Sequence, residues 1–213
     1  ATATDILTLT QWLSPAYPVG AFAYSHGLEW AIDAGDVTSP EQTGAWISDI
    51  LRHGSGWNDS LFLAVAYGAD DHELQEVDAT ARAFSASAER LKETRLQGAA
   101  FCNITAKVWS ADLQNLTYPV AVGRAAMLNS LPLDLTGQMY LQAFMANLVA
   151  AAMRLVPLGQ TDGQTLIRDL TSLCSQIAKD AGMATLDDLA SSAFLTDIAS
   201  MKHETQYSRI FRT

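Results

Sequence analysis

The side chains best suited to chemistry in this chain are four histidines and two cysteines, spread over 213 residues. Cys102 and Cys174 lie in helical patterns and lack the paired C-x-x-C spacing of a cysteine zinc site. Helical bundles build di-iron centres from Glu-x-x-His pairs, and that spacing does not occur. His26 and Glu29 show the reverse order once, which supplies too few ligands for a metal ion. We therefore expect no stably bound metal or other cofactor.

Motifs for nucleophilic catalysis and for nucleotide binding are missing from the sequence. It contains no G-x-S-x-G nucleophile elbow, no G-x-x-x-x-G-K-[ST] phosphate loop and no G-x-G-x-x-G fingerprint. A triad assembled only by folding is left open, but an all-helical chain without these motifs favours a protein that is not an enzyme.

The most irregular stretch runs from Ser14 to Trp30 and reads SPAYPVGAFAYSHGLEW. Pro15, Pro18 and Gly20 predict a defined loop, because proline fixes φ and glycine permits backbone angles closed to other residues. We expect a helix to follow from about Phe22 to near Gly35. The stretch could be a loop-helix corner packed by aromatics, or a platform on which aromatic side chains anchor another protein.

Apolar residues at helical spacing, with capping residues between the runs, predict an all-α fold. Strand patterns and Asn-Gly hairpin signals do not occur. We expect one helical, bundle-like domain over residues 1–200, with about eight to ten helices, and a short C-terminal tail over 201–213. Helices are predicted at 39–54, 59–69, 70–85, 87–109, 119–129, 135–155 and 161–182, and residues 186–200 as a helix or broken helix. Pro157 is expected to end the apolar helix before it.

Charge and hydropathy exclude two classes of partner. The net charge is −10, and residues 1–78 hold twelve acidic residues against the single base Arg52. A nucleic-acid partner is not expected, because phosphate binding needs clustered Lys and Arg. The uncharged run from Leu135 to Met153 contains Gln138, Gln142 and Asn147, so we expect a buried core helix and no membrane span. No signal-like segment opens the sequence, which favours a cytoplasmic location.

Four stretches, in order along the chain, closely resemble the urease accessory protein F (UreF) family. They are Pro18 to Glu29 (PVGAFAYSHGLE), Tyr118 to Gly123 (YPVAVG), Arg154 to Thr161 (RLVPLGQT) and Met201 to Arg212 (MKHETQYSRIFR). Thr213 departs from the serine expected at the family's ending. The resemblance covers essentially the whole chain.

The resemblance implies an all-α, non-enzymatic homodimer that bridges a G-type GTPase and an accessory protein of the D/H type. The assembly would deliver nickel to apo-urease and alter GTP hydrolysis by the GTPase, with nickel passing through the complex. Partners are expected to bind the first and last of the four stretches, through Pro18, Val19, Gly20, Phe22, Tyr24, His26, Glu29, Lys202, His203, Glu204, Tyr207, Arg209 and Phe211. The alternatives are a helical metal-binding enzyme and a generic helical interaction domain.

The C-terminal tail alternates charged with aromatic residues and is too short to form a hydrophobic core of its own. Little stability is lost by leaving such a segment mobile, and it fits a segment that becomes ordered when a partner binds; the sequence leaves open whether it is ordered without one.

Overall fold

The computed structural model describes residues 1–109, 111–156 and 158–212. In these residues, runs of helix-forming residues make up the helices, and Ser, Pro, Gly and Asp stand at their boundaries. The predicted all-α fold is confirmed for these residues. The elements are α1 (Ala3–Trp12), α2 (Leu28–Asp33), α3 (Pro40–His53), α4 (Ser55–Gly68), α5 (Asp71–Ala83), α6 (Ala88–Trp109), α7 (Tyr118–Leu128), α8 (Leu133–Leu155), α9 (Gln160–Ala181) and α10 (Phe194–His203), with 3-10 turns at Ala21–Ala23 and Leu186–Asp188.

The predicted N-cap of α3, Ser39, is confirmed, whereas the N-cap of α9 is Gly159, two residues before the predicted Thr161. Ser39 caps α3 by accepting from the Gln42 amide at 3.3 Å, and Pro40 takes the first turn, where its missing N–H costs nothing. α9 begins instead at Gln160, because the Asp162 side chain accepts from the Gly159 amide at 3.2 Å. Pro157 and Thr213 lie outside the described residues.

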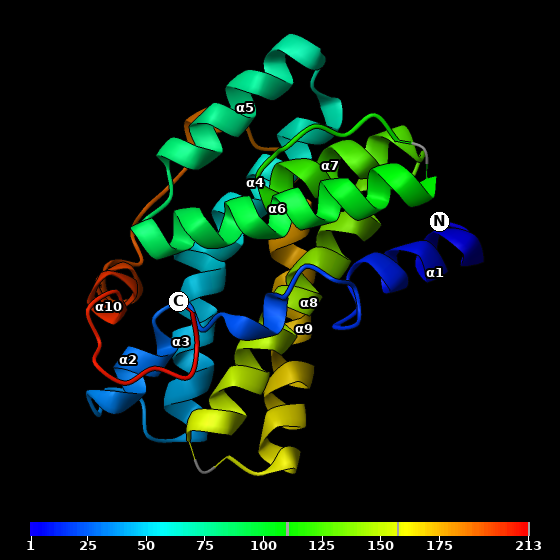
Figure 1. Ribbon diagram of the computed structural model, residues 1–213. Helices are drawn as coiled ribbons and strands as arrows, with labels where there is room; N and C mark the ends of the chain where they lie inside the picture. The colour runs from blue at the N-terminus through cyan, green and yellow to red at the C-terminus, as the bar shows by residue number, and fades with distance from the viewer. Residues whose placement is uncertain (110, 157, 213) are drawn as a thin grey trace.

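The hydrophobic core surrounds α4, which packs against α3, α5, α7, α8 and α9. α4 contributes Leu61, Phe62, Leu63 and Ala66 to this core. The closest helix pairs are α4 with α7 and α8 with α9, and Figure 1 shows α8 and α9 as a long antiparallel pair beside α3. Much of the predicted apolar helix is accordingly buried, including Leu141, Met145, Leu148 and Val149. Among the described helices, none is both long and apolar enough to cross a membrane.

A second, smaller apolar cluster joins the beginning of the chain to the end of α8. Leu28 and Ala31 of α2 pack there with Ala152 and Val156. α10 lies against α2, and the last residues of the chain run back past α2 toward α3 (Figure 1). The stretch around α2 and the last residues of the chain therefore meet at one edge of the molecule, whereas the N-terminus lies on the other side with α1 (Figure 1).

Candidate partner-binding site

The loop after α1 takes its shape from three residues whose backbone has positive φ. Gly20 has φ +74° and precedes the 3-10 turn, whereas His26 and Gly27 both have positive φ just before α2. The predicted left-handed role of Gly20 is confirmed. The predicted helix from Phe22 is wrong, because left-handed residues at 26 and 27 break any right-handed helix there. Phe22 and His26 consequently do not share a helix face.

Gly27 also lets α10 approach the loop closely. A Cβ placed on this glycine would lie 2.5 Å from the Ser200 amide nitrogen and 2.8 Å from the Ala199 carbonyl carbon, closer than atoms can approach. Only glycine fits this position, for space and for φ alike. The sequence analysis did not single out this role, since the contact joins residues far apart in the chain.

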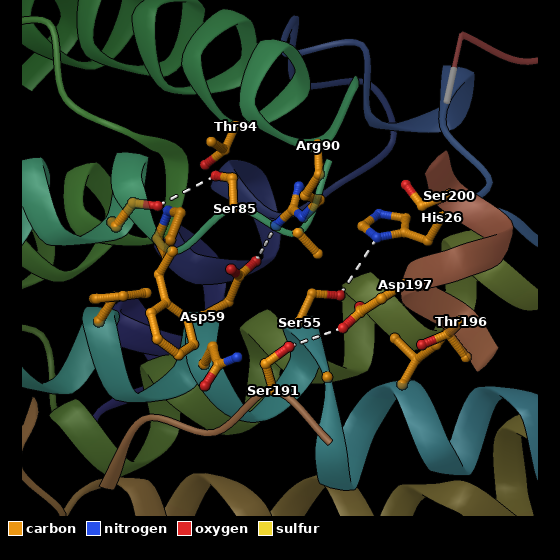
Figure 2. Close-up of a pocket in the computed structure, with 18 residues that line it drawn as sticks. His26, Ser55, Asp59, Ser85, Arg90, Thr94, Ser191, Thr196, Asp197 and Ser200 are labelled. Atoms are coloured by element: carbon orange, nitrogen blue, oxygen red, sulfur yellow. Dashed lines mark hydrogen bonds and ion pairs between the residues drawn. The ribbon is translucent and has the colours of Figure 1, made fainter. Parts of the chain in front are cut away.

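His26 is buried and belongs to an ionic network at the centre of the molecule. Its Nε2 lies 3.1 Å from Glu93 Oε1, and its Nδ1 lies 3.4 Å from the Ser55 hydroxyl. Arg90 approaches Glu93 Oε2 at 3.0 Å and donates to Asp59 at 2.6 Å. Figure 2 shows His26, Ser55, Arg90 and Asp59 around one polar cavity, with the Arg90–Asp59 contact drawn as a dashed line.

Electrostatics keep this network ionised. Burial alone would raise the pKa of the Glu93 carboxyl, but Arg90 and His26 outweigh it and lower that pKa to about 2. Burial likewise opposes the charge on Arg90, and Asp59 and Glu93 raise its pKa despite it. The Tyr140 hydroxyl donates to Asp59 at 2.8 Å, and burial raises the pKa of that phenol well above its ordinary value. A buried charge needs such partners, so the network fixes the loop, α4, α6 and α8 relative to one another.

Glu29 joins the first motif to the last. Its carboxylate accepts from the backbone amides of Ile210 at 2.6 Å and Phe211 at 2.9 Å, and lies 3.0 Å from His203 Nε2. These contacts bridge 174 to 182 residues of sequence. The first and the last of the four stretches that resemble the UreF family are thus one structural unit.

Residues 204–212, here called the C-terminal segment, are packed against the rest of the chain. Phe211 is buried, with the Arg154 guanidinium 5.4 Å from its ring centroid, and the Arg212 amide donates to the Ala23 carbonyl at 2.8 Å. The Glu204 carboxylate accepts from the Ala88 amide at 2.9 Å and so serves the N-terminus of α6. In this structure Glu29 and the Phe211 site hold the segment without a partner.

The predicted partner-binding residues divide by exposure. Six of the thirteen are buried and support the surface: Val19, Tyr24, His26, Glu29, His203 and Phe211. Six are exposed and one, Gly20, is half-buried; the exposed ones are Pro18, Phe22, Lys202, Glu204, Tyr207 and Arg209. Arg209 nevertheless donates to Glu89 at 2.6 Å. α10 runs to His203, so Lys202 and His203 occupy its last turn and the helix passes through the expected boundary at residue 200.

Sequence reasoning missed the outward face of α10. Phe194, Leu195, Ile198 and Met201 are 68%, 73%, 47% and 51% exposed and lie on one side of the helix, whereas its inward side carries Thr196, Ala199, Ser200 and His203. This arrangement reverses the usual amphipathic pattern of a surface helix. The spacing of residues 194, 198 and 201 was the available signal, and it was missed because residues 186–200 were predicted only as a helix or broken helix, without a face assigned to them.

No grouping of three or more His, Cys, Asp or Glu side chains suited to a metal ion occurs among the described residues. Two small cavities, of about 50 and about 40 Å³, flank the network, and His26, Asp59 and Arg90 line both. Each has room for a few water molecules. The geometry is that of an all-α protein in which α10, packed with α2 and the C-terminal segment, carries an exposed apolar helix face.

Comparison with known proteins gives the family. The UreF family model matches residues 37–171. A urease accessory protein UreF from Ruegeria pomeroyi is 66% identical over 213 residues, covering 100% of this chain and 98% of the relative. UreF proteins from Roseobacter denitrificans and Cereibacter sphaeroides are 55% and 48% identical, covering 97% and 98% of this chain and 93% and 98% of the relatives. The chain belongs to the UreF family of urease accessory proteins.

Proposed function

We propose that this chain is a non-enzymatic, cytoplasmic subunit of the assembly that inserts nickel into apo-urease. In this proposal it bridges the G-type GTPase and the accessory protein of the D/H type, and nickel is cargo of the assembled complex. The names of the relatives support a role in urease maturation, and the motifs quoted above support the bridging role by resemblance.

One observation supports the bridging role most directly: α10 exposes an apolar face, and further exposed apolar residues follow it in the C-terminal segment. Tyr207 is fully exposed and Ile210 is 68% exposed, so large apolar groups follow one another from Phe194 to Ile210. Exposed apolar groups gathered on one helix face are typical of protein-protein interfaces. Lys202, in the last turn of the same helix, is exposed as well. We assign this surface to the accessory protein of the D/H type.

The experiment compares two substitutions at positions of equal exposure. Leu195 on α10 and Met183 after α9 are both 73% exposed, so aspartate at either position costs the folded chain little. Leu195→Asp should reduce co-purification with the D/H-type protein by about tenfold or more, since it places a charge in an apolar contact. Met183→Asp should leave it unchanged. Equal retention of the partner by both variants would overturn the assignment.

The proposal also includes a homodimer and an effect on GTP hydrolysis that belongs to the partner. Phosphate release should be absent from this protein alone and altered when it is added to the GTPase. Light scattering at micromolar concentration should give twice the chain mass of 23.0 kDa. Turnover by the protein alone, or a mass near 23.0 kDa that persists on concentrating, would contradict these parts of the proposal.

A further inference from the structure

We propose that the junction of α3 and α4 positions the first turns of α10, and that Asn58 is the main positioning residue. Residues 188–193, here called the strap, lead from the second 3-10 turn into α10. The positioning of α10 is a property of the chain without partners. Its consequence for partner binding rests on the proposed function, because Phe194 and Leu195 belong to the surface assigned there to the accessory protein of the D/H type.

Asn58 pairs with the strap as a neighbouring β-strand would. Its Nδ2 donates to the Ala190 carbonyl at 2.6 Å, and its Oδ1 accepts from the Ala190 amide at 3.1 Å. One side chain thus satisfies both polar backbone groups of a strap residue, because a side-chain amide carries a donor and an acceptor together. At the start of the strap, Trp57 Nε1 donates to the Asp188 carbonyl at 2.9 Å.

The end of α3 binds the rest of the strap. α3 stops at His53, since Gly54 leaves the helical conformation with φ −125° and ψ −140°. Carbonyl groups in the last turn of a helix lack a partner within the helix. The His53 carbonyl accepts instead from the amides of Ser192 at 3.3 Å and Ala193 at 3.2 Å. The strap is therefore bonded to the α3–α4 junction up to the residue that precedes α10.

These hydrogen bonds decide the position because little apolar surface lies under the first turns of α10. Of residues 194–198, all of which the structure describes, Thr196 alone is buried. Beneath them lies the polar cavity of about 50 Å³, which Asn58 also lines. Figure 2 shows Thr196 and Asp197 at this cavity, with Asp197 bonded to Ser191 of the strap. Apolar burial cannot fix this end of the helix, so the bonds of the strap must.

The other end of α10 is held separately. The Ser200 hydroxyl lies 2.7 Å from the Ser87 hydroxyl, and His203 contacts Glu29 at 3.0 Å. Gly27 also admits the backbone of Ser200 at close range. Loss of the strap contacts should therefore loosen the first turns of α10 while its last turn stays in place, a pattern that loss of the whole helix would not give.

Hydrogen exchange measured by NMR on the full chain without partners tests the positioning role. Asn58→Leu keeps nearly the same side-chain volume and removes both bonds to Ala190. The amides of Ala190, Ser192 and Asp197 should exchange about tenfold faster or more, as expected when two hydrogen bonds are lost. The amides of residues 201–203 should change much less. Unchanged exchange in the strap, or an equal increase at 201–203, would overturn the proposal.

A matched control and a second variant complete this test. Asn129 Nδ2 donates to the Ala125 carbonyl at 2.8 Å at the end of α7, which Figure 1 shows on another side of the molecule from α10. Asn129→Leu therefore loses a similar bond and should leave exchange in the strap as in the parent. Trp57→Phe removes a single strap bond and should speed exchange at Ala190 by about fivefold, including where Asn58→Leu fails to fold. No change in Trp57→Phe, or faster strap exchange in Asn129→Leu, would count against the proposal.

Co-purification with the D/H-type protein separates this inference from the proposed function. If both hold, Asn58→Leu should reduce retention of the partner by about threefold or more, and Leu195→Asp by about tenfold. Faster strap exchange with full retention in Asn58→Leu, beside a loss in Leu195→Asp, would overturn the role of Asn58 in partner binding. Full retention by both variants would contradict the surface assigned to the partner, and faster strap exchange would then still support the positioning of α10.

Discussion

At the scale of single residues, buried charged side chains hold the first loop, α2 and the C-terminal segment in place. Glu29, Glu93, Arg90 and His203 are all largely removed from water, and each has at least two partners of opposite charge or hydrogen-bonding character. Removal of one partner from such a set typically costs about 3–5 kcal/mol, because the other charge stays buried without compensation. These residues therefore specify which segments meet.

Glu93 gives the clearest prediction for pH. Its pKa is lowered to about 2 in the folded chain, so its ionisation stabilises the fold above its ordinary pKa and that contribution disappears as pH falls toward about 2. Glu93→Gln should lower the free energy of unfolding in urea by on the order of 3 kcal/mol at about pH 5, and by much less at about pH 2.5. An equal deficit at both pH values would contradict the assigned ion pairs.

The residue scale also shows where sequence reasoning stops. Pro18, Val19, Gly20 and Phe22 could be recognised as a shaped loop from their own types, because proline and glycine act locally. The partners of His26 and His203 could not, since Glu93 and Glu29 are 67 and 174 residues away. No periodicity links them. Both histidines were recognised as members of unusual motifs, without an indication that they are buried ion-pair partners.

At the scale of elements, most helices were predictable because their caps and apolar stripes are local. Ser39 and Gly54 bound α3 as expected, and α6 and α8 were placed to within two residues. α1 was not predicted, although Thr2 and Asp5 form a capping box at its start. The prediction of a helix from Phe22 was wrong for a different reason, because the positive φ of His26 depends on tertiary contacts.

The junction of α10 with the first loop predicts a large difference between two glycines. Gly20 and Gly27 have φ of +74° and +76°, so alanine at either position meets similar backbone strain. A Cβ at Gly20 has nothing within 4 Å, whereas at Gly27 it meets the backbone of Ser200. Gly27→Ala should therefore lower the free energy of unfolding by about 1–3 kcal/mol more than Gly20→Ala. Equal losses in urea titrations would rule out the close approach.

The C-terminal segment gives a prediction opposite to that for a mobile tail. Deletion of residues 205–213 removes the two backbone amides that donate to Glu29 and empties the Phe211 site. The melting temperature should therefore fall by several degrees, at about 2–4 °C per kcal/mol. Helical circular dichroism should change little, since α10 ends at His203. Tyr207→Ala, at a fully exposed position, is the control and should melt as the parent. An unchanged melting temperature on deletion would show that docking contributes nothing.

At the scale of the whole molecule, the helical core differs from the edge where α2, α10 and the C-terminal segment meet. α4, α7, α8 and α9 bury the large apolar groups, while the first loop, α2, α10 and the C-terminal segment meet at one edge and leave apolar groups exposed. The fold class and the family could be anticipated from patterns and motifs. The surface could not, because the outward turn of α10 is set by small and polar residues that pack inward.

The central claim is that α10 and the C-terminal segment bind the accessory protein of the D/H type. Hydrogen exchange measured by mass spectrometry, on the chain alone and in that complex, tests this claim most directly. We predict that amides of residues 194–212 exchange more slowly in the complex, because α10 and the C-terminal segment become covered. Residues 71–83 of α5, on another side of the molecule, provide the internal reference (Figure 1). A stable complex in which exchange slows elsewhere and stays unchanged throughout 194–212 would contradict the account.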